Sequence, residues 1–454
     1  MDNGSINQVI HAFATKAIEL GGWMELDRLY LQNKISGLIG VKKWQATVVV
    51  PLTTQSTEDL IHTLCKYACE HRTISDEPSA KYQLQVELSD LLTPPPSVVN
   101  AFFAQHYASK PEAATEYFHQ LMTVNGYIQP IESHVQQTFT VPTDYGLVPI
   151  AIESRSTVNT NQPVQQQKTH CIYCMENEGF AGDNECLSLR NQRIIRMNLN
   201  GESWGLQYVA RPQLIEECLI VAEQHEAASA TNKQLEQLLQ IVDIFPHYFI
   251  AANEHRTTAH AHYHGGMNSS WPLAKAEMVQ EETLQLFPEV TIGSVKWPLS
   301  VIRLQSSNSQ MIKQAADYLI QKWQNQSDEP LNRPFVTIVA RKSTTGYLLE
   351  LILRKETAPD LTLVEILGQH HLSNQVLDQW QVVEQAVRTV PVVPAFPTIS
   401  WTSYLSAIDL PATQEQITEW IQQALGLHYT KRLEQAAAFP KNKAGQLQFQ
   451  QFMK

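Results

Sequence analysis

Three histidines at alternate positions form the stretch of this sequence best suited to chemistry. His260, His262 and His264 are separated by single residues, and Gly265 and Gly266 follow directly. On a β-strand alternate side chains share one face, so all three imidazoles would line the same surface. Imidazole binds metals and acts as a nucleophile or acid–base group near neutral pH, and glycine lets the backbone approach a ligand closely. A solvated histidine-rich loop is the alternative, but this spacing favours a site.

A pair of cysteines offers a second piece of chemistry. Cys171 and Cys174 form a C-x-x-C pair, and two thiolates at this spacing can share one zinc ion. A tetrahedral site needs two more ligands, for which His225 and His260 are candidates. The residues alone also leave structural thiols or redox use open. The other cysteines are interpreted as buried apolar thiols: Cys65, Cys69, Cys186 and Cys218.

Strands and a helix surround these residues in a pattern that occurs twice. Around the histidines we expect a hairpin that turns at Asn200-Gly201, a short apolar strand, a helix from Thr231 and a buried strand. These elements cover 193–199 with 202–208, 219–222, 231–242 and 247–250. A similar order follows in strand 301–304, helix 312–323 and strands 335–340 and 347–354. The repetition predicts two related α+β halves.

The rest of the chain divides around these halves. Residues 6–108 are predicted to be helical with a break at Pro94–Pro96, and the polar stretch 154–168 is interpreted as a linker or surface loop. We expect four segments: a mainly helical N-terminal region (1–150), a first half that carries the cysteines and histidines (151–290), a second half (291–395) and a helical tail (396–454).

Length, charge and composition exclude several functions. The chain has 454 residues, 43% of them hydrophobic, and a formal net charge of −12. An acidic surface repels phosphate backbones, so we expect no nucleic-acid partner. The start shows no export signal, and no apolar run is long enough to cross a bilayer. We therefore expect a cytoplasmic protein without a membrane partner.

Several strings resemble the type II galactose-1-phosphate uridylyltransferases of the histidine-triad superfamily. They occur in order over most of the chain: Glu25-Leu-Asp-Arg-Leu-Tyr30, Cys171-Ile-Tyr-Cys-Met-Glu-Asn-Glu-Gly-Phe-Ala-Gly182, Asn191-Gln-Arg-Ile-Ile195, Leu199-Asn-Gly-Glu-Ser-Trp204, Phe245-Pro-His-Tyr-Phe-Ile250 and Trp297-Pro-Leu-Ser-Val-Ile-Arg-Leu304. The resemblance implies an α+β fold of two histidine-triad-like halves with antiparallel sheets, preceded by a mainly helical N-terminal region.

The resemblance also implies an activity. In this family the second histidine of a His-x-His motif attacks the α-phosphorus of UDP-glucose, and galactose 1-phosphate then takes the uridylyl group. That histidine corresponds to His262, with UDP-glucose and a hexose 1-phosphate as substrates and a homodimer as the expected assembly. A structural zinc would be bound by the residues that match the family's ligands: Cys171, Cys174, His225 and His260. Asn253, Asn191 and Gly265 correspond to substrate-binding positions.

The sequence departs from the family pattern near the histidines. His264 stands where the family has a glutamine that donates a hydrogen bond to the phosphoryl oxygens, a role that neutral histidine fills in one tautomer only. A Gly-Gly-Ser segment that helps to hold phosphate is missing, and Arg256 is a candidate substitute, with an ordinary surface arginine as the alternative. His370 and His371 are not followed by the family's lysine-rich string and are interpreted as a solvated loop.

These departures leave three hypotheses. The first is uridylyl transfer between sugar phosphates through His262. The second is a nucleotidyl hydrolase or phosphorylase, which the third histidine favours. The third is a catalytically weak relative that binds nucleotide on the same scaffold.

Overall fold

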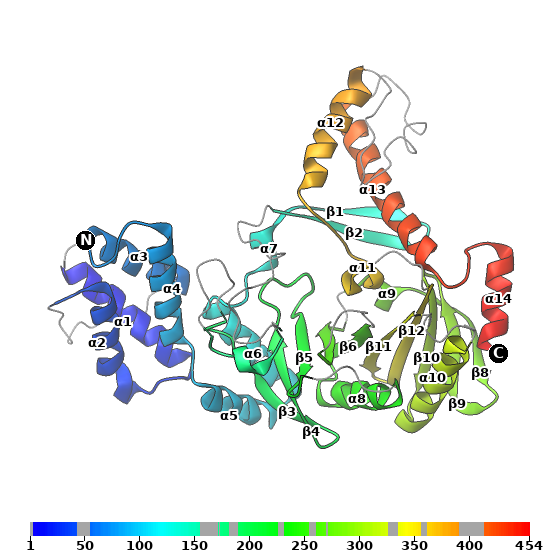
Figure 1. Ribbon diagram of the computed structural model, residues 1–454, viewed down its shortest axis with the longest axis horizontal. Helices are drawn as coiled ribbons and strands as arrows, with labels where there is room; N and C mark the ends of the chain where they lie inside the picture. The colour runs from blue at the N-terminus through cyan, green and yellow to red at the C-terminus, as the bar shows by residue number, and fades with distance from the viewer. Residues whose placement is uncertain are drawn as a thin grey trace. The chain divides into compact units, whose positions relative to one another are not determined.

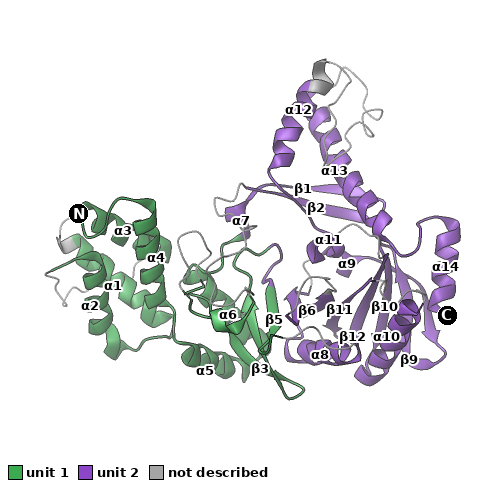
Figure 2. Cartoon of the chain, in the orientation of Figure 1, with its two compact units in different colours: residues 1–130, 156–212, 218–226 green, residues 131–155, 213–217, 227–454 purple. Residues whose placement is uncertain are grey.

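We describe a computed structural model of the chain. It describes residues 3–42, 55–154, 171, 173–180, 189–225, 231–253, 260–268, 271–325, 335–355, 361–389 and 413–454. Cys186, Arg256 and residues 155–168 of the expected linker lie outside this set. The chain forms two compact units, of which the first comprises residues 1–130, 156–212 and 218–226 and the second comprises the remainder (Figure 2). In the described part, no helix combines the length and apolar composition that a bilayer span requires.

Helices make up the N-terminal part of the first unit, as the sequence predicts (Figure 1). They are α1 (Asn3–Glu19), η1 (Glu25–Asp27), α2 (Arg28–Ile39), α3 (Thr57–Glu70), α4 (Pro78–Leu92), α5 (Pro96–Tyr107) and α6 (Pro111–Val124). A capping box between Ser56 and Asp59 begins α3. The predicted break falls between α4 and α5, where Pro96 is the first helical residue. The apolar faces of α1 to α4 share one core, which includes Phe13, Ile35 and Leu64.

The predicted hairpin of the first unit is confirmed. Strand β3 (Ile195–Leu199) pairs antiparallel with β4 (Glu202–Tyr208), and β4 pairs with β5 (Cys218–Ala222). The turn residues Asn200 and Gly201 both have positive φ, 52° and 87°. Two successive left-handed residues are what a tight two-residue hairpin turn requires, and Asn-Gly is the pair that adopts them most easily. The short 3-10 helix η2 (Met175–Asn177) also belongs to this unit.

The second unit contains the remaining strands. They are β1 (Val135–Thr143), β2 (Gly146–Glu153), β6 (Tyr248–Asn253), β7 (His262–Met267), β8 (Met278–Leu284), β9 (Phe287–Val295), β10 (Ser300–Ser306), β11 (Phe335–Ser343), β12 (Gly346–Arg354) and β13 (His370–Leu372). Its helices are α7 (Ile131–His134), α8 (Thr231–Ile244), α9 (Pro272–Lys275), α10 (Ser309–Gln324), α11 (Leu363–Leu367), α12 (Gln375–Thr389), α13 (Gln414–Ala436) and α14 (Lys443–Met453). The β1–β2 hairpin was not predicted from the sequence. It forms a three-stranded sheet with β13.

The large sheet shows the same topology twice. Its ten strands hydrogen-bond in the order β3-β4-β5-β7-β6-β11-β12-β10-β9-β8. Read from its two edges, the first half runs β3-β4-β5-β7-β6 and the second runs β8-β9-β10-β12-β11. In each half a helix follows the third strand, α8 after β5 and α10 after β10. The expected α+β class with two related antiparallel halves is therefore confirmed. The predicted segment boundaries at residues 150, 290 and 395 stay a prediction, because the two compact units are defined by packing and each combines parts of several segments.

Two layers cover the second unit's part of the sheet. Helix α8 contacts β6 and β11, and α10 contacts β9, β10 and β12. Residues of the opposite face, including Ala251, Val301, Val339 and Ile352, belong to a core shared with β2, α11 and α13. Alternation along each strand separates the two faces. The face directed away from α8 and α10 is the one that carries the candidate site.

Candidate functional site

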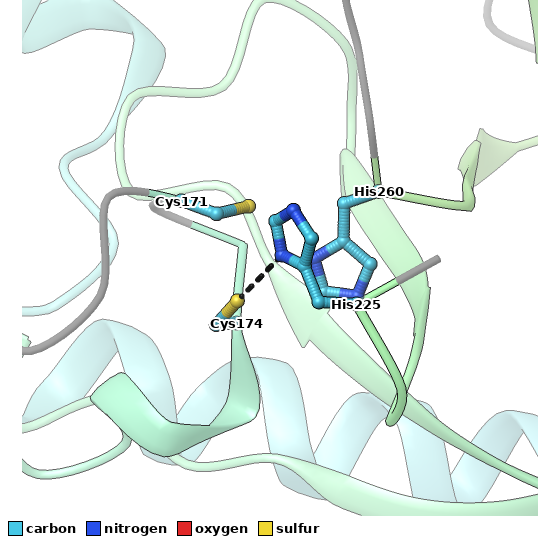
Figure 3. A group of neighbouring side chains, drawn as sticks. All are labelled: Cys171, Cys174, His225 and His260. Atoms are coloured by element: carbon cyan, nitrogen blue, oxygen red, sulfur yellow. Dashed lines mark hydrogen bonds between the residues drawn. The ribbon is translucent and has the colours of Figure 1, made fainter. Parts of the chain in front are cut away.

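Four predicted metal ligands lie together. The thiols of Cys171 and Cys174 and the ring nitrogens of His225 and His260 all lie within 4.8 Å of one another (Figure 3). The Cys174 Sγ atom lies 3.2 Å from Nδ1 of His225. Tetrahedral zinc with bonds of about 2.0–2.3 Å brings its ligand atoms to roughly 3.5 Å from one another. The cluster therefore needs only small side-chain adjustments to surround one ion.

The local backbone positions the cysteine pair. The Cys174 amide donates to the Cys171 carbonyl at 3.2 Å, and the Asn177 side chain donates to the same carbonyl at 2.8 Å. Burial raises the pKa of the Cys171 thiol, and the neighbouring Cys174 raises it further. A bound cation reverses this effect because it stabilises thiolate. Two thiols and two imidazoles, with Cys174 and His260 buried, are a donor set that suits zinc.

Of the three histidines predicted to share a strand face, His262 and His264 do so on β7, whereas His260 precedes the strand and its ring belongs to the metal cluster. Tyr263 between them is buried, and its hydroxyl donates to the Gln237 side chain of α8 at 2.6 Å. Tyr263 therefore faces α8, and the two histidines face the opposite side of the sheet. Both imidazoles are half-buried, and their ring centroids are 5.1 Å apart. A half-buried ring is held in place and is still open to solvent on one side.

The hydrogen bond on His262 fixes its tautomer. Its Nδ1 lies 2.8 Å from the backbone carbonyl of His260. A carbonyl oxygen only accepts hydrogen bonds, so Nδ1 carries a proton, and in the neutral ring Nε2 is then the unprotonated nitrogen. The same residue that offers its ring to the metal cluster thus orients the neighbouring imidazole through its backbone. This arrangement presents Nε2 of His262 as a nucleophile or base.

The other predicted site residues differ in what surrounds them. Gly265 pairs with Ile250 inside the sheet. Asn253 ends β6 and pairs with Thr337 of β11, while Arg256 lies outside the described residues. Asn191, in the first unit, is buried and exchanges hydrogen bonds with Asn125: each side-chain amide donates to the other backbone carbonyl, at 2.9 and 3.1 Å. A substrate-binding role for these residues stays a prediction.

A buried arginine that the sequence did not single out lies near Asn253. The guanidinium group of Arg354 donates from Nη2 to the hydroxyl of Thr337 at 3.1 Å, and the residue is 4% exposed. Thr337 pairs with Asn253 across the two strands, so Arg354 contacts the residue that pairs with the end of β6. In the sequence, Arg354 stands at the end of a mainly apolar strand. An arginine there is usually an ordinary exposed residue, so nothing in the sequence marked it as part of a site.

The second half carries a buried ion cluster at the corresponding position. Strands β6 and β11 pair antiparallel with Ala251 and Val339 at the centre of the paired residues, and the strand order repeats on either side of them. His264 opposes Ala251, and Glu350 opposes Val339, so Glu350 is the counterpart of His264. The Glu350 carboxylate accepts from Arg303 Nε at 3.0 Å and from Arg341 Nη2 at 2.7 Å.

The interpretation of His370 as part of a solvated loop is wrong. His370 begins β13, is 2% exposed and packs its ring 4.9 Å from that of Tyr429 on α13. Burial lowers the pKa of His370 to about 3. His371 is half-buried, and its Nδ1 lies 3.3 Å from a carboxylate oxygen of Glu153. Pairing of β13 with β2 explains the error, since the partner strand was not predicted.

Known proteins resemble this chain over nearly its whole length. The family profile described as "Galactose-1-phosphate uridyl transferase, N-terminal domain" matches residues 22–187. A galactose-1-phosphate uridylyltransferase of Enterococcus faecalis is 30% identical, covering 98% of this chain and 97% of the relative. Those of Streptococcus mutans and Lactococcus lactis are 30% and 29% identical, each covering 98% or more of both chains. A solved yeast Ap4A phosphorylase matches with a TM-score of 0.39 at 11% identity, covering 75% of this chain and 97% of the other; a likeness this weak carries no argument. With its Cys/His cluster, its paired histidines and this extent of similarity, the chain belongs to the galactose-1-phosphate uridylyltransferase family.

Proposed function

We propose that this protein transfers the uridylyl group of UDP-glucose to galactose 1-phosphate through a covalent intermediate on His262. The similarity to galactose-1-phosphate uridylyltransferases over almost the full length of both chains supports the reaction. The observation that carries the assignment of the nucleophile is the 2.8 Å hydrogen bond between His262 Nδ1 and the His260 carbonyl. It leaves Nε2 with the lone pair that a nucleophile needs.

The reaction divides into two displacements at phosphorus. Nε2 of His262 attacks the α-phosphorus of UDP-glucose and forms a P–N bond, while the bond to the bridging oxygen breaks and glucose 1-phosphate leaves. A phosphate oxygen of galactose 1-phosphate then attacks the same phosphorus, the P–N bond breaks and UDP-galactose forms. Imidazole is both a good nucleophile and a good leaving group, so one difficult transfer becomes two easier ones.

Zinc is the metal that we assign to Cys171, Cys174, His225 and His260. A four-ligand site of this kind has no open position and is structural. Its contribution to the site would be to hold the backbone of His260, whose carbonyl orients His262. The residues around the cluster thus act on the position and tautomer of the nucleophile rather than on the substrate.

His264 is proposed to donate a hydrogen bond to the phosphoryl oxygens. Its ring lies 5.1 Å from that of His262 on the same face, a separation that leaves room for a phosphoryl group in contact with both. The presence of a third histidine in place of glutamine favours a second candidate function, transfer of the nucleotidyl group to water or to phosphate. Product analysis separates the two functions.

The test is a coupled assay with trapping of the intermediate. Wild-type protein with UDP-glucose alone should retain labelled uridylate on His262, and addition of galactose 1-phosphate should release UDP-galactose. His262→Ala should abolish both steps, whereas His62→Ala, which changes an exposed histidine of α3, should not. UMP as the only product would support hydrolysis instead. A His262→Ala variant that keeps full activity would contradict the assignment.

Two further expectations belong to this proposal. We expect a homodimer, which light scattering of the purified protein measures directly. We also expect a cytoplasmic location, in line with substrates that are intracellular sugar nucleotides.

A further inference from the structure

A cavity of about 260 Å³ lies at the far edge of the second half. Its walls come from β8, the end of β9, the β1–β2 turn and α14. Five strand spacings separate β9 from β7 in the sheet order, which corresponds to roughly 24 Å. The cavity is therefore distinct from the site at His262 and takes no part in the proposed reaction.

Two lysines give this cavity a positive character. Lys296 is exposed at its rim, and Lys441 lies in its wall, where Nζ donates to the Leu299 carbonyl at 2.8 Å. One hydrogen bond leaves two further N–H donors on the Lys441 ammonium group. No carboxylate is among the lining residues, and within the described ranges neither lysine has a salt-bridge partner. Burial lowers the pKa of Lys441 to about 8, and the Glu434 carboxylate, which accepts from the Tyr145 hydroxyl at 2.7 Å, acts in the opposite direction. Charge favours an anionic ligand here.

Neutral hydrogen-bonding groups complete the wall. Gln280, Gln446 and Gln450 line the cavity, and each carries a side-chain amide that can donate and accept hydrogen bonds. Gln280 has a φ of 56°, a left-handed conformation that is unfavourable for a non-glycine residue, and it lies in an irregular part of the β8–β9 pairing. Bulges of this kind redirect a side chain, and backbone strain concentrates at ligand sites. Amides of this kind can bind sugar hydroxyls through both donor and acceptor atoms.

We propose that this cavity binds the phosphate ester of a monosaccharide as a second ligand site. Lys296 and Lys441 would bind the phosphate, and the glutamine amides would bind the hydroxyl groups. The volume lies just below the range of about 300–1,000 Å³ typical of sites for larger ligands. This volume suits a small ligand such as a hexose phosphate better than a larger nucleotide sugar. The inference is independent of the identity of the catalytic residue.

Calorimetric titration with glucose 6-phosphate tests the proposal. Wild-type protein should bind one equivalent of glucose 6-phosphate at the cavity, in addition to any that binds at the His262 site. Lys441→Gln and Lys296→Gln should each weaken binding at the cavity at least about tenfold, the usual loss for a charge-assisted hydrogen bond. Lys443→Gln is the matched control, because Lys443 is an exposed lysine on α14 that does not line the cavity.

The outcomes separate the parts of the proposal. Lys296 is exposed, so its replacement leaves the fold intact even if Lys441→Gln perturbs folding. Titrations with glucose and with inorganic phosphate should both show weaker binding than glucose 6-phosphate. Equal binding of glucose would overturn the phosphate assignment, and equal binding of inorganic phosphate would overturn the sugar assignment. Unchanged affinity in both lysine variants would place the ligand elsewhere and overturn the site.

Discussion

The buried carboxylate of Glu350 allows a quantitative prediction about stability. Glu350→Ala removes an acceptor with a side chain that is 0% exposed and is shared by two guanidinium groups. Loss of one partner from a buried ion pair costs about 3–5 kcal/mol, because the remaining charge is uncompensated. Two charges remain in this case, but Arg303 also donates to the Leu273 and Ala276 carbonyls at 2.9 Å. We therefore expect the free energy of unfolding to fall by about 3–5 kcal/mol and not by twice that amount.

Urea denaturation followed by circular dichroism measures this change. Glu282→Ala is the matched control, because Glu282 is exposed on β8 and such surface changes usually stay within about 0.5 kcal/mol. Adding Arg341→Met to Glu350→Ala removes one uncompensated charge, so the double variant should be more stable than the single one. A loss below about 1 kcal/mol in Glu350→Ala, or a double variant less stable than the single one, would refute this reasoning.

Three further outcomes are expected. His264→Ala should lower the rate of uridylyl transfer by ~100- to 1,000-fold, because a hydrogen-bond donor to the phosphoryl oxygens is lost. His264→Gln should keep most of the rate. Equal losses for the two variants in steady-state assays would contradict a donor role. Cys174→Ser should lower the zinc content from about one ion per chain, measured by mass spectrometry, and a metal content unchanged from wild type would contradict the ligand assignment. The pKa of His370 is about 3 in the folded protein and 6.5 ordinarily, so the folded state binds fewer protons between these values and loses stability as pH falls from 6.5 toward 3. Denaturation at pH 7 and at pH 4 measures this change. The free energy of unfolding should fall less between these pH values in His370→Phe than in the wild type, and an equal fall in both proteins would count against burial of a neutral ring.

Local patterns in the sequence predicted the elements that depend on neighbouring residues. The β3–β4 hairpin followed from Asn200-Gly201, because the turn conformation is a property of those two residues. The shared face of His262 and His264 followed from alternation alone, and Tyr263 confirms it. The α+β class followed from the repetition of strand and helix patterns.

Features that depend on distant contacts could not be predicted in this way. His225 and His260 are far from the cysteine pair in the sequence, so the residues alone offered them only as candidate ligands, and the family resemblance was needed to match all four to one site. His370 has polar neighbours that suggest a loop, while its burial depends on Tyr429 of α13 and on pairing with β2. Glu350 interrupts an apolar strand, and nothing local identifies Arg303 as its partner.

The same strand topology occurs twice in this chain, and the two copies carry different groups at corresponding positions. The copy that contains β7 has half-buried imidazoles at the proposed catalytic positions, whereas the copy that contains β12 has an internal ion pair at the counterpart position. Replacement of the imidazoles in the first copy is therefore expected to affect turnover, whereas replacement of Glu350 in the second is expected to affect the yield of folded protein. We therefore expect a variant at His262 or His264 to alter the enzyme's rate and a variant at Glu350 to alter its abundance.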